Sequence, residues 1–148
     1  MSDAADRACL RFDYGAWDEG RGELADTRDA LAWARERYET AALFGYSFGG
    51  CLALVAAARE SEAGRPPSAV AALSPADRLS ADIDAAAAVE TIDPPVAVVY
   101  GRRDTTVDAE TVASRIDAAG GVVETVDADH FFVGQAGKVA DRVGAFLS

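Results

Sequence analysis

One serine, one aspartate and the only histidine of the chain have the residue types and the order of a nucleophile, an acid and a base. Ser47 lies in a G-x-S-x-G sequence at positions 45–49, and Asp104 and His130 each follow an apolar run. A serine hydroxyl becomes nucleophilic when an imidazole accepts its proton, and a carboxylate can fix the imidazole tautomer. If an imidazole of this chain activates Ser47, His130 must supply it. The residues therefore predict acyl transfer through an acyl-Ser47 intermediate.

The G-x-S-x-G sequence has the surroundings that a nucleophile elbow requires. An apolar run begins at Ala41, the serine stands at a turn, and an apolar helix follows at 51–58. Side chains two residues either side of the serine are expected to collide with the turn, which explains the two glycines. The helix begins beneath Ser47, so its free N–H groups and its dipole are expected to point at negative charge that develops on a substrate oxygen.

Apolar runs alternate with helical patterns along the chain, which predicts how these residues are positioned. Repeated strand–helix alternation indicates a parallel sheet, and loops after parallel strands emerge at one edge. The sequence thus predicts an α/β protein with three α/β/α layers and a mostly parallel sheet. The expected strands are 8–12, 41–46, 69–73, 96–100 and 122–126; the expected helices are 23–38, 51–58, 82–89 (weak), 108–119 and one beginning near 135.

Two aspartates are candidates for the acid that partners His130. Asp104 follows the strongest predicted strand and is the preferred partner of His130. Asp77 follows the preceding strand and is the alternative, whereas Asp108 is better explained as a helix N-cap.

Length and composition narrow the class of protein. The 148 residues fit one domain, and a hydrophobic content of 50% allows a substantial core. The formal net charge of -11 argues against nucleic-acid and membrane partners. An acidic, lysine-poor composition is typical of cytoplasmic proteins from salt-loving microbes, and an ordinary acidic cytosolic protein is the alternative. The sequence shows neither a signal peptide nor a membrane-spanning run, so a cytoplasmic location is expected.

Three other residues are interpreted as packing residues. Cys9 and Cys51 lie in apolar stretches and are expected to be buried in a reducing compartment, without a disulfide. No zinc-ligand spacing is present. Trp33 lies at the edge of the apolar stripe of helix 23–38 and is expected to pack there.

The chain resembles the α/β-hydrolase superfamily, and within it the small lidless branch of dienelactone-hydrolase-like and related predicted esterases. Positions 45–50, 100–104 and 128–132 match the three catalytic stretches of that family, and 11–15 resembles the end of its fourth strand. The resemblance implies Ser47, Asp104 and His130 as catalytic residues, the Phe48 N–H in the oxyanion hole, a small acyl substrate, and no metal or organic cofactor. Only about twenty residues separate two central strands, too few for a cap domain, so an open site is expected.

The chain departs from the family pattern at its N-terminus. The family places three strands and a helix before the strand assigned to 8–12, whereas seven residues precede it here. We therefore expect an N-terminally truncated fold that lacks a central strand and the second oxyanion N–H, and that tends to self-associate through an open sheet edge. Three functions follow: a serine hydrolase for a small carboxylic ester or thioester, a weak or inactive partial domain completed by further N-terminal residues or a partner, and an acyltransferase.

Overall fold

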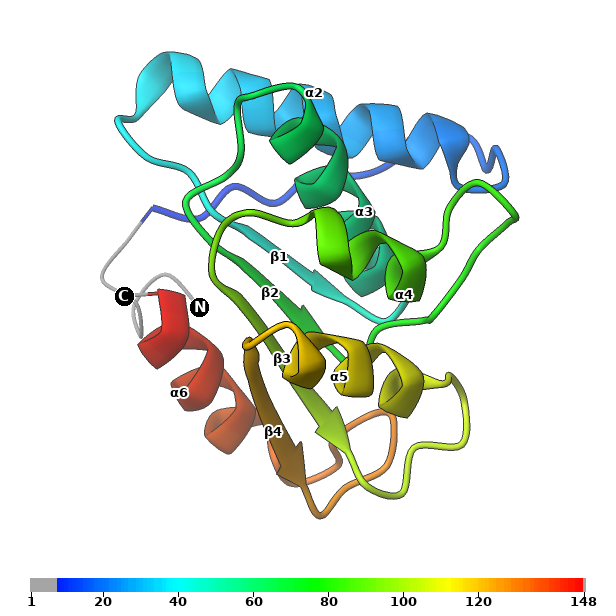
Figure 1. Ribbon diagram of the computed structural model, residues 1–148. Coiled ribbons are helices and arrows are strands. Elements are labelled where there is room, and N and C mark those ends of the chain that lie inside the picture. Colours follow the sequence, from blue (N-terminus) through cyan, green and yellow to red (C-terminus); the bar gives the residue numbers. More distant parts are fainter. Residues whose placement is uncertain (1–7, 148) are drawn as a thin grey trace.

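The computed structural model describes residues 8–147, which form a sheet with helices on both faces (Figure 1). The elements in chain order are α2 (Arg21–Arg37), β1 (Leu43–Tyr46), α3 (Phe48–Glu62), β2 (Val70–Leu73), α4 (Ala85–Ala88), the 3₁₀ helix η1 (Val89–Thr91), β3 (Val96–Gly101), α5 (Ala109–Ala118), β4 (Val122–Val126) and α6 (Ala136–Leu147). The expected three-layer α/β/α class is confirmed.

All neighbouring strands of the sheet are parallel. Within residues 8–147 the four-stranded sheet has the order β1-β2-β3-β4, with Leu43 opposite Val70 and Val70 opposite Val96. Each connection carries a helix, as parallel pairing requires. The loops after β1, β3 and β4 therefore emerge at the same edge.

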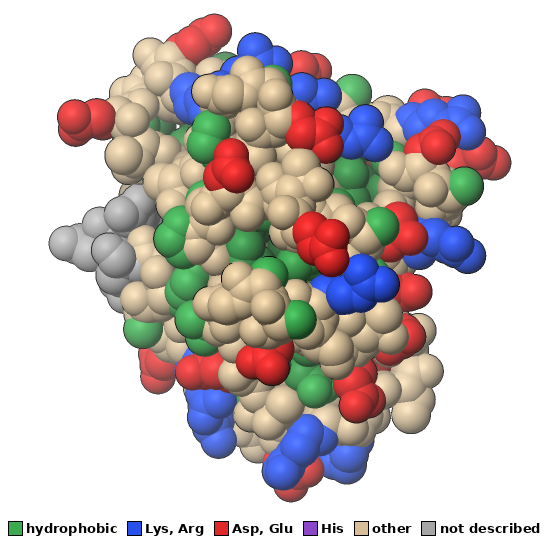
Figure 2. Space-filling model, in the orientation of Figure 1, with side chains coloured by type: hydrophobic (Ala, Val, Ile, Leu, Met, Phe, Trp, Pro, Cys, Tyr) green, Lys and Arg blue, Asp and Glu red, His purple; other side chains and the backbone are tan. Residues whose placement is uncertain are grey.

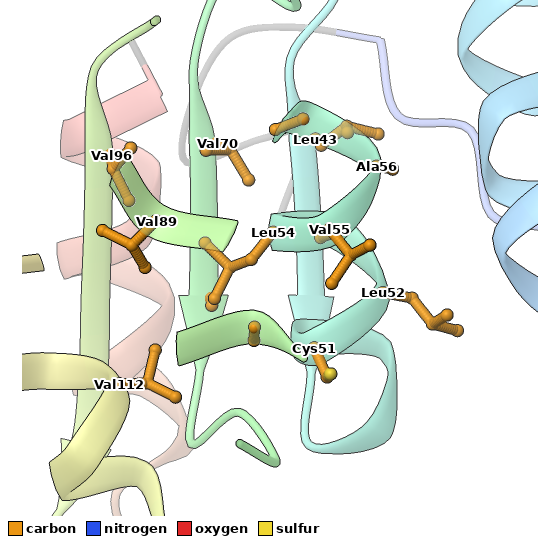
Figure 3. Close-up of a cluster of buried hydrophobic side chains, with 14 of the residues drawn as sticks. Leu43, Cys51, Leu52, Leu54, Val55, Ala56, Val70, Val89, Val96 and Val112 are labelled. Atoms are coloured by element: carbon orange, nitrogen blue, oxygen red, sulfur yellow. The ribbon is translucent and has the colours of Figure 1, made fainter. Parts of the chain in front are cut away.

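The larger part of the core lies between the sheet and α3. This helix is rich in Ala, Leu and Val, and contacts β1 and β2 on one side and α2 on another. Such a helix is apolar nearly all round because it is covered nearly all round. The close-up in Figure 3 shows side chains from the sheet, α3, η1 and α5 converging here, with Leu43, Cys51, Leu54, Val70, Val96 and Val112 among them.

The second face of the sheet is covered by α6, which contacts β2 and β3 (Figure 1). Val139 and Val143 of this helix are buried against the sheet, and Phe146 packs partly buried beside them. The amphipathic pattern beginning near residue 135 is therefore confirmed as a helix with the expected apolar face.

The predicted helix at 108–119 is confirmed as α5, and its ends follow local chemistry. The Asp108 carboxylate accepts from the N–H of Thr111 at 3.1 Å, which makes it the N-cap. The chain leaves the helix through Gly120, whose φ is 85°. The weaker pattern at 82–89 forms the short α4, which continues into η1.

The prediction of a strand at 8–12 is wrong. These residues have no regular secondary structure, and Leu10 and Phe12 are exposed. The ring of Phe12 instead lies edge-on to Tyr14, and Tyr14 lies edge-on to Phe48. An apolar run becomes a strand only when a neighbour supplies backbone partners, and here aromatic packing takes the place of ladder pairing.

No strand within residues 8–147 pairs with the second side of β1, which is therefore an edge strand of the described sheet. The N–H groups of Leu43 and Ser47 donate to backbone carbonyl groups on the β2 side, those of Ala69 and Leu73, at 3.0 and 2.9 Å. Because alternate residues of a parallel strand bond to the same neighbour, the backbone groups of Phe44 and Tyr46 face the open edge. The expectation that β1 lacks a neighbour on one side therefore agrees with the described structure.

The two cysteines differ in exposure, so the shared expectation of burial is wrong for Cys9. Cys9 is exposed because the segment that carries it forms no strand, whereas Cys51 is buried within α3. Burial raises the pKa of the Cys51 thiol to about 12, so this thiol stays protonated. Trp33 is 41% exposed at the edge of α2, and the Arg37 guanidinium lies 4.0 Å from its ring centroid.

A buried carboxylate joins α2 to α3. Glu60 is 3% exposed and accepts hydrogen bonds from Arg28 at 2.7 Å, Arg35 at 3.2 Å and Arg65 at 2.7 Å. Burial alone would raise the pKa of Glu60, but the three arginine hydrogen bonds lower it below its ordinary value. This network fixes α3 from the side opposite the sheet.

Charged side chains of both signs are spread over the face shown in Figure 2 rather than gathered in separate patches. Among residues 8–147, no helix has the length and the apolar composition needed to span a bilayer.

Candidate active site

Ser47 occupies a strained turn between β1 and α3. Its φ of 56° and ψ of -116° are rarely adopted by a residue with a side chain, so neighbouring contacts must hold it there. The Ser47 N–H donates to the Leu73 carbonyl at 2.9 Å, and the Ser47 carbonyl accepts from the N–H groups of Gly50, Cys51 and Ala76 at 3.0 to 3.1 Å. The turn is thus fixed by the start of α3 and by the segment after β2.

The two glycines of the G-x-S-x-G sequence have different structural roles. A Cβ added at Gly45 would lie 2.0 Å from the Gly49 carbonyl oxygen, so this position accepts no side chain. A Cβ at Gly49 would meet only the Tyr14 hydroxyl, at an ordinary 3.4 Å. The expected collision is therefore present at Gly45 and absent at Gly49, because the second glycine already lies in the first turn of α3 and points away from β1.

The structure brings the side chains of Ser47, Asp104 and His130 into one hydrogen-bonded chain. His130 Nε2 lies 2.9 Å from Ser47 Oγ, and His130 Nδ1 lies 2.7 Å from Asp104 Oδ2. The three residues come from the loops after β1, β3 and β4, as parallel topology predicts. Asp104, and not the alternative Asp77, contacts the imidazole.

Asp104 is held by its own loop as well as by the imidazole. Its Oδ1 atom accepts from the N–H groups of Thr106 at 2.8 Å and Val107 at 3.2 Å, and its side chain is 2% exposed. Burial alone would raise the pKa of Asp104, but the hydrogen bonds from His130 and from these two N–H groups lower it below its ordinary value. An ionised Asp104 favours the tautomer with the proton on Nδ1, which leaves the Nε2 lone pair directed at Ser47.

A close backbone approach places the Asp104 loop against the His130 loop. A Cβ added at Gly101, the last residue of β3, would lie 2.4 Å from the Ala128 carbonyl oxygen. The Arg103 N–H donates to the same carbonyl at 3.0 Å. Gly101 therefore lets the two loops meet closely enough for the carboxylate to reach the imidazole.

His130 is enclosed by aromatic rings. The residue is 4% exposed, the Tyr46 ring is stacked on the imidazole with centroids 5.2 Å apart, and the Phe131 ring lies edge-on at 5.3 Å. The Tyr46 hydroxyl also donates to the His130 backbone carbonyl at 2.8 Å. Sequence reasoning does not single out Tyr46, whose one available signal is its place between Gly45 and Ser47.

The start of α3 supplies free donors beside Ser47. Phe48 is the first residue of this helix, and the N–H groups of the first helical residues, before those that donate to the Ser47 carbonyl, have no acceptor within the helix. The positive end of the helix dipole lies at the same place. These features suit the stabilisation of negative charge on an acyl oxygen.

The surroundings of Ser47 are open and aromatic. The Trp17 ring lies 5.3 Å from the Phe48 ring and is 63% exposed, and Phe131 on the histidine side is 69% exposed. A cavity of about 440 Å³ lies elsewhere, between the sheet and α6, and is lined by residues such as Val99 and Phe146. No residue of the hydrogen-bonded chain lines it. Within 8–147 no cluster of three or more His, Cys, Asp or Glu side chains is placed to hold a metal ion.

Solved structures share this architecture at low sequence identity. The chain resembles an esterase from Pyrobaculum calidifontis, with a TM-score of 0.78, 18% identity, and coverage of 99% of this chain and 67% of that chain. It also resembles an α/β serine hydrolase homologue from Coxiella burnetii, with a TM-score of 0.72, 21% identity, and coverage of 99% of this chain and 74% of that chain. An esterase/lipase from an uncultured bacterium matches with a TM-score of 0.75, 20% identity, and coverage of 99% and 67%.

Sequence comparison alone gives no relative: no family model matches the chain, and no curated protein matches it. Identities near 20%, with TM-scores of 0.72 and 0.75, establish the fold. The chain has the α/β-hydrolase fold.

Proposed function

We propose that the protein is a serine hydrolase that cleaves a small carboxylic ester or thioester through an acyl-Ser47 intermediate. The observation that carries the proposal is the hydrogen-bonded chain in which His130 Nε2 lies 2.9 Å from Ser47 Oγ and Nδ1 lies 2.7 Å from Asp104. A nucleophile, a base and an acid in this geometry are the requirement for acyl transfer. The likeness to esterase structures supports the same reaction class.

In the proposed mechanism, Ser47 Oγ attacks the acyl carbon while its proton passes to His130 Nε2. Asp104 stabilises the imidazolium that forms, and the Phe48 N–H donates to the oxyanion. The tetrahedral intermediate then expels the alcohol or thiol, which takes the proton from His130. A water molecule attacks the acyl-Ser47 ester by the same route, which releases the carboxylic acid and restores Ser47.

A second candidate, a weakly active partial domain, is favoured by one observation. β1 is an edge strand of the described sheet, and among residues 8–147 the N–H groups that we assign to the oxyanion hole come from the start of α3 alone. Loss of one oxyanion donor costs about 10²–10³ in kcat. A protein that is labelled at Ser47 but has a low kcat would fit this candidate rather than a fully active esterase.

Labelling with a fluorophosphonate probe, at low and at high salt, tests the nucleophile directly. We expect the probe to modify Ser47 in the wild type, with the site identified by peptide mass spectrometry, and the Ser47→Ala variant to remain unlabelled. A panel of esters and thioesters, with and without an added alcohol as acceptor, then separates hydrolysis from acyl transfer. Absence of labelling in a folded wild type, or labelling that persists in Ser47→Ala, would refute the proposal.

A further inference from the structure

Tyr46 is the residue that contacts His130 in two separate ways. Its hydroxyl donates to the His130 carbonyl oxygen at 2.8 Å across 84 residues of sequence. Its ring is stacked on the imidazole, with centroids 5.2 Å apart and planes inclined by 28°. One contact fixes the backbone of His130, and the other fixes the plane of its side chain.

Strand geometry explains why Tyr46 can reach His130. Side chains alternate between the two faces of a strand, and the burial pattern of β1 shows Leu43 and Gly45 buried with Phe44 and Tyr46 exposed. Tyr46 thus lies on the face opposite α3, at the strand end next to Ser47. The nucleophile and the residue that holds its base are therefore neighbours in the chain, on one rigid element.

Contacts other than hydrogen bonds fix the plane of the His130 imidazole. The aromatic residues that follow His130 differ in exposure, since Phe132 is buried with a φ of 53° whereas Phe131 is 69% exposed. Hydrogen bonds at Nδ1 to Asp104 and at Nε2 to Ser47 both lie near the plane of the imidazole, so they leave the ring able to tilt about the line that joins them. A ring stacked against the imidazole removes this freedom.

We propose that Tyr46 is a positioning residue for His130, which orients the imidazole toward Ser47 through the hydroxyl and the ring together. This inference rests on the proposed serine hydrolase function. Burial, with the charges of Asp104 and Asp129, raises the pKa of the Tyr46 phenol, so the hydroxyl keeps the proton that it donates.

Two variants separate the two contacts, and the same strand offers a matched control. Tyr46→Phe removes the hydroxyl and keeps the ring, whereas Tyr46→Leu removes both. Phe44→Leu changes an aromatic residue on the same face of β1, with 38% exposure against 40% for Tyr46 and no ring contact to His130. We expect all three proteins to fold, which a thermal melt checks.

The kinetic readout is the split between kcat and KM on an ester that the wild type hydrolyses. A misplaced base slows chemistry and leaves ground-state binding unchanged. We expect kcat to fall about threefold to tenfold in Tyr46→Phe and about tenfold to 100-fold in Tyr46→Leu, with KM within about twofold of wild type. Phe44→Leu should match the wild type in both constants.

A spectroscopic readout needs no activity. Because His130 is the only histidine, its ring signals in a ¹⁵N-histidine sample require no assignment. We expect a downfield Nδ1–H proton signal in the wild type and in Phe44→Leu, and its loss through exchange broadening in Tyr46→Leu. An unchanged Nδ1–H signal together with wild-type kcat in Tyr46→Leu would overturn the inference.

Failure of the proposed hydrolase function can be told apart from failure of the inference about Tyr46. If the wild type neither labels nor turns over, the proposed function fails, while the NMR comparison still decides whether Tyr46 holds the imidazole. If Tyr46→Leu does not fold, Tyr46→Phe decides the question, because it keeps the ring: wild-type kcat and an unchanged Nδ1–H signal in that variant would overturn the role of the hydroxyl.

Discussion

Replacing Asp104 by asparagine should lower kcat by about 10⁴ while leaving the fold in place. The side-chain amide of the Asp104→Asn variant can still accept from the N–H groups of Thr106 and Val107 through its oxygen. Its NH₂ group then faces His130 Nδ1, where the carboxylate oxygen lies 2.7 Å away in the wild type. A donor at that place requires Nδ1 to be an acceptor, so the imidazole proton moves to Nε2 and the base can no longer accept the proton of Ser47.

The two consequences differ in size. A wrong tautomer in such a site costs about 10⁴ in kcat, equivalent to about 5.4 kcal/mol at 1.36 kcal/mol for each factor of ten. Exchange of a charge-assisted hydrogen bond for a neutral one costs about 1–1.5 kcal/mol of stability, or roughly 2–6 °C in Tm for a domain of this size. The loss of activity should therefore greatly exceed any loss of folded protein at room temperature.

Three measurements check this prediction: kcat on an ester, the Tm, and the ¹⁵N shifts of the His130 ring, which report which nitrogen carries the proton. Asp77→Asn serves as the control, because Asp104 and not Asp77 contacts the imidazole. Asp104→Asn with kcat within about tenfold of wild type, or with the proton still on Nδ1, would refute the reasoning. So would Asp77→Asn with the larger loss.

The remaining predictions concern stability and assembly. Glu60→Gln should lower Tm by about 5–10 °C in calorimetry, because the substitution leaves three arginines around a neutral group. A decrease in Tm of less than about 2 °C would contradict this prediction. The pKa values of Glu60 and Asp104 are lowered in the folded protein, so both carboxylates contribute their full stabilisation above the unfolded-state pKa of about 4. This stabilisation is lost as the pH falls through the pKa values of the folded state. Tm should therefore drop below a pH of about 4, and it should drop less steeply in Glu60→Gln. With a net charge of -11, Tm should rise into molar salt, whereas a flat or falling curve favours an ordinary acidic protein. We propose self-association through the open edge of β1, so sedimentation should show concentration-dependent dimers that Phe44→Pro abolishes and Phe44→Leu retains; a monomer at all concentrations would contradict this.

The part of the site that sequence predicts well is the part set by local chemistry and topology. The turn at Ser47 needs a glycine at 45 because of a backbone contact within five residues, and such contacts leave a recognisable pattern. Asp104 and His130 follow strands whose parallel arrangement can be read from alternation alone. Parallel topology then places the loops that carry these residues at one edge.

Contacts between distant residues leave no such pattern, so sequence reasoning does not find them. Glu60 looks like any charged residue near a helix end, yet it is buried because Arg28 and Arg35 arrive from a helix 25 to 32 residues away. Tyr46 occupies a position of the motif that any residue can fill. Residues 8–12 have a strand-like composition, but pairing needs a neighbour, and composition does not show whether one is present.

The site divides into two parts with separate structural origins. The hydrogen-bonded chain of Ser47, Asp104 and His130 depends on β1, β3 and β4, which together with β2 form one continuous sheet. The open aromatic border beside Ser47 depends instead on the irregular segment that carries Trp17, which touches the site through the ring of Phe48. The strands are held by ladder hydrogen bonds and core burial, whereas the irregular segment is held by ring contacts and by hydrogen bonds to side chains of α2, such as Gly15 N–H to Asp26 at 2.9 Å and Asp18 N–H to Glu23 at 2.6 Å. The positions of nucleophile, base and acid are therefore fixed by the sheet, while the aromatic surface beside Ser47 is set by how the segment before α2 packs on that helix and on Phe48.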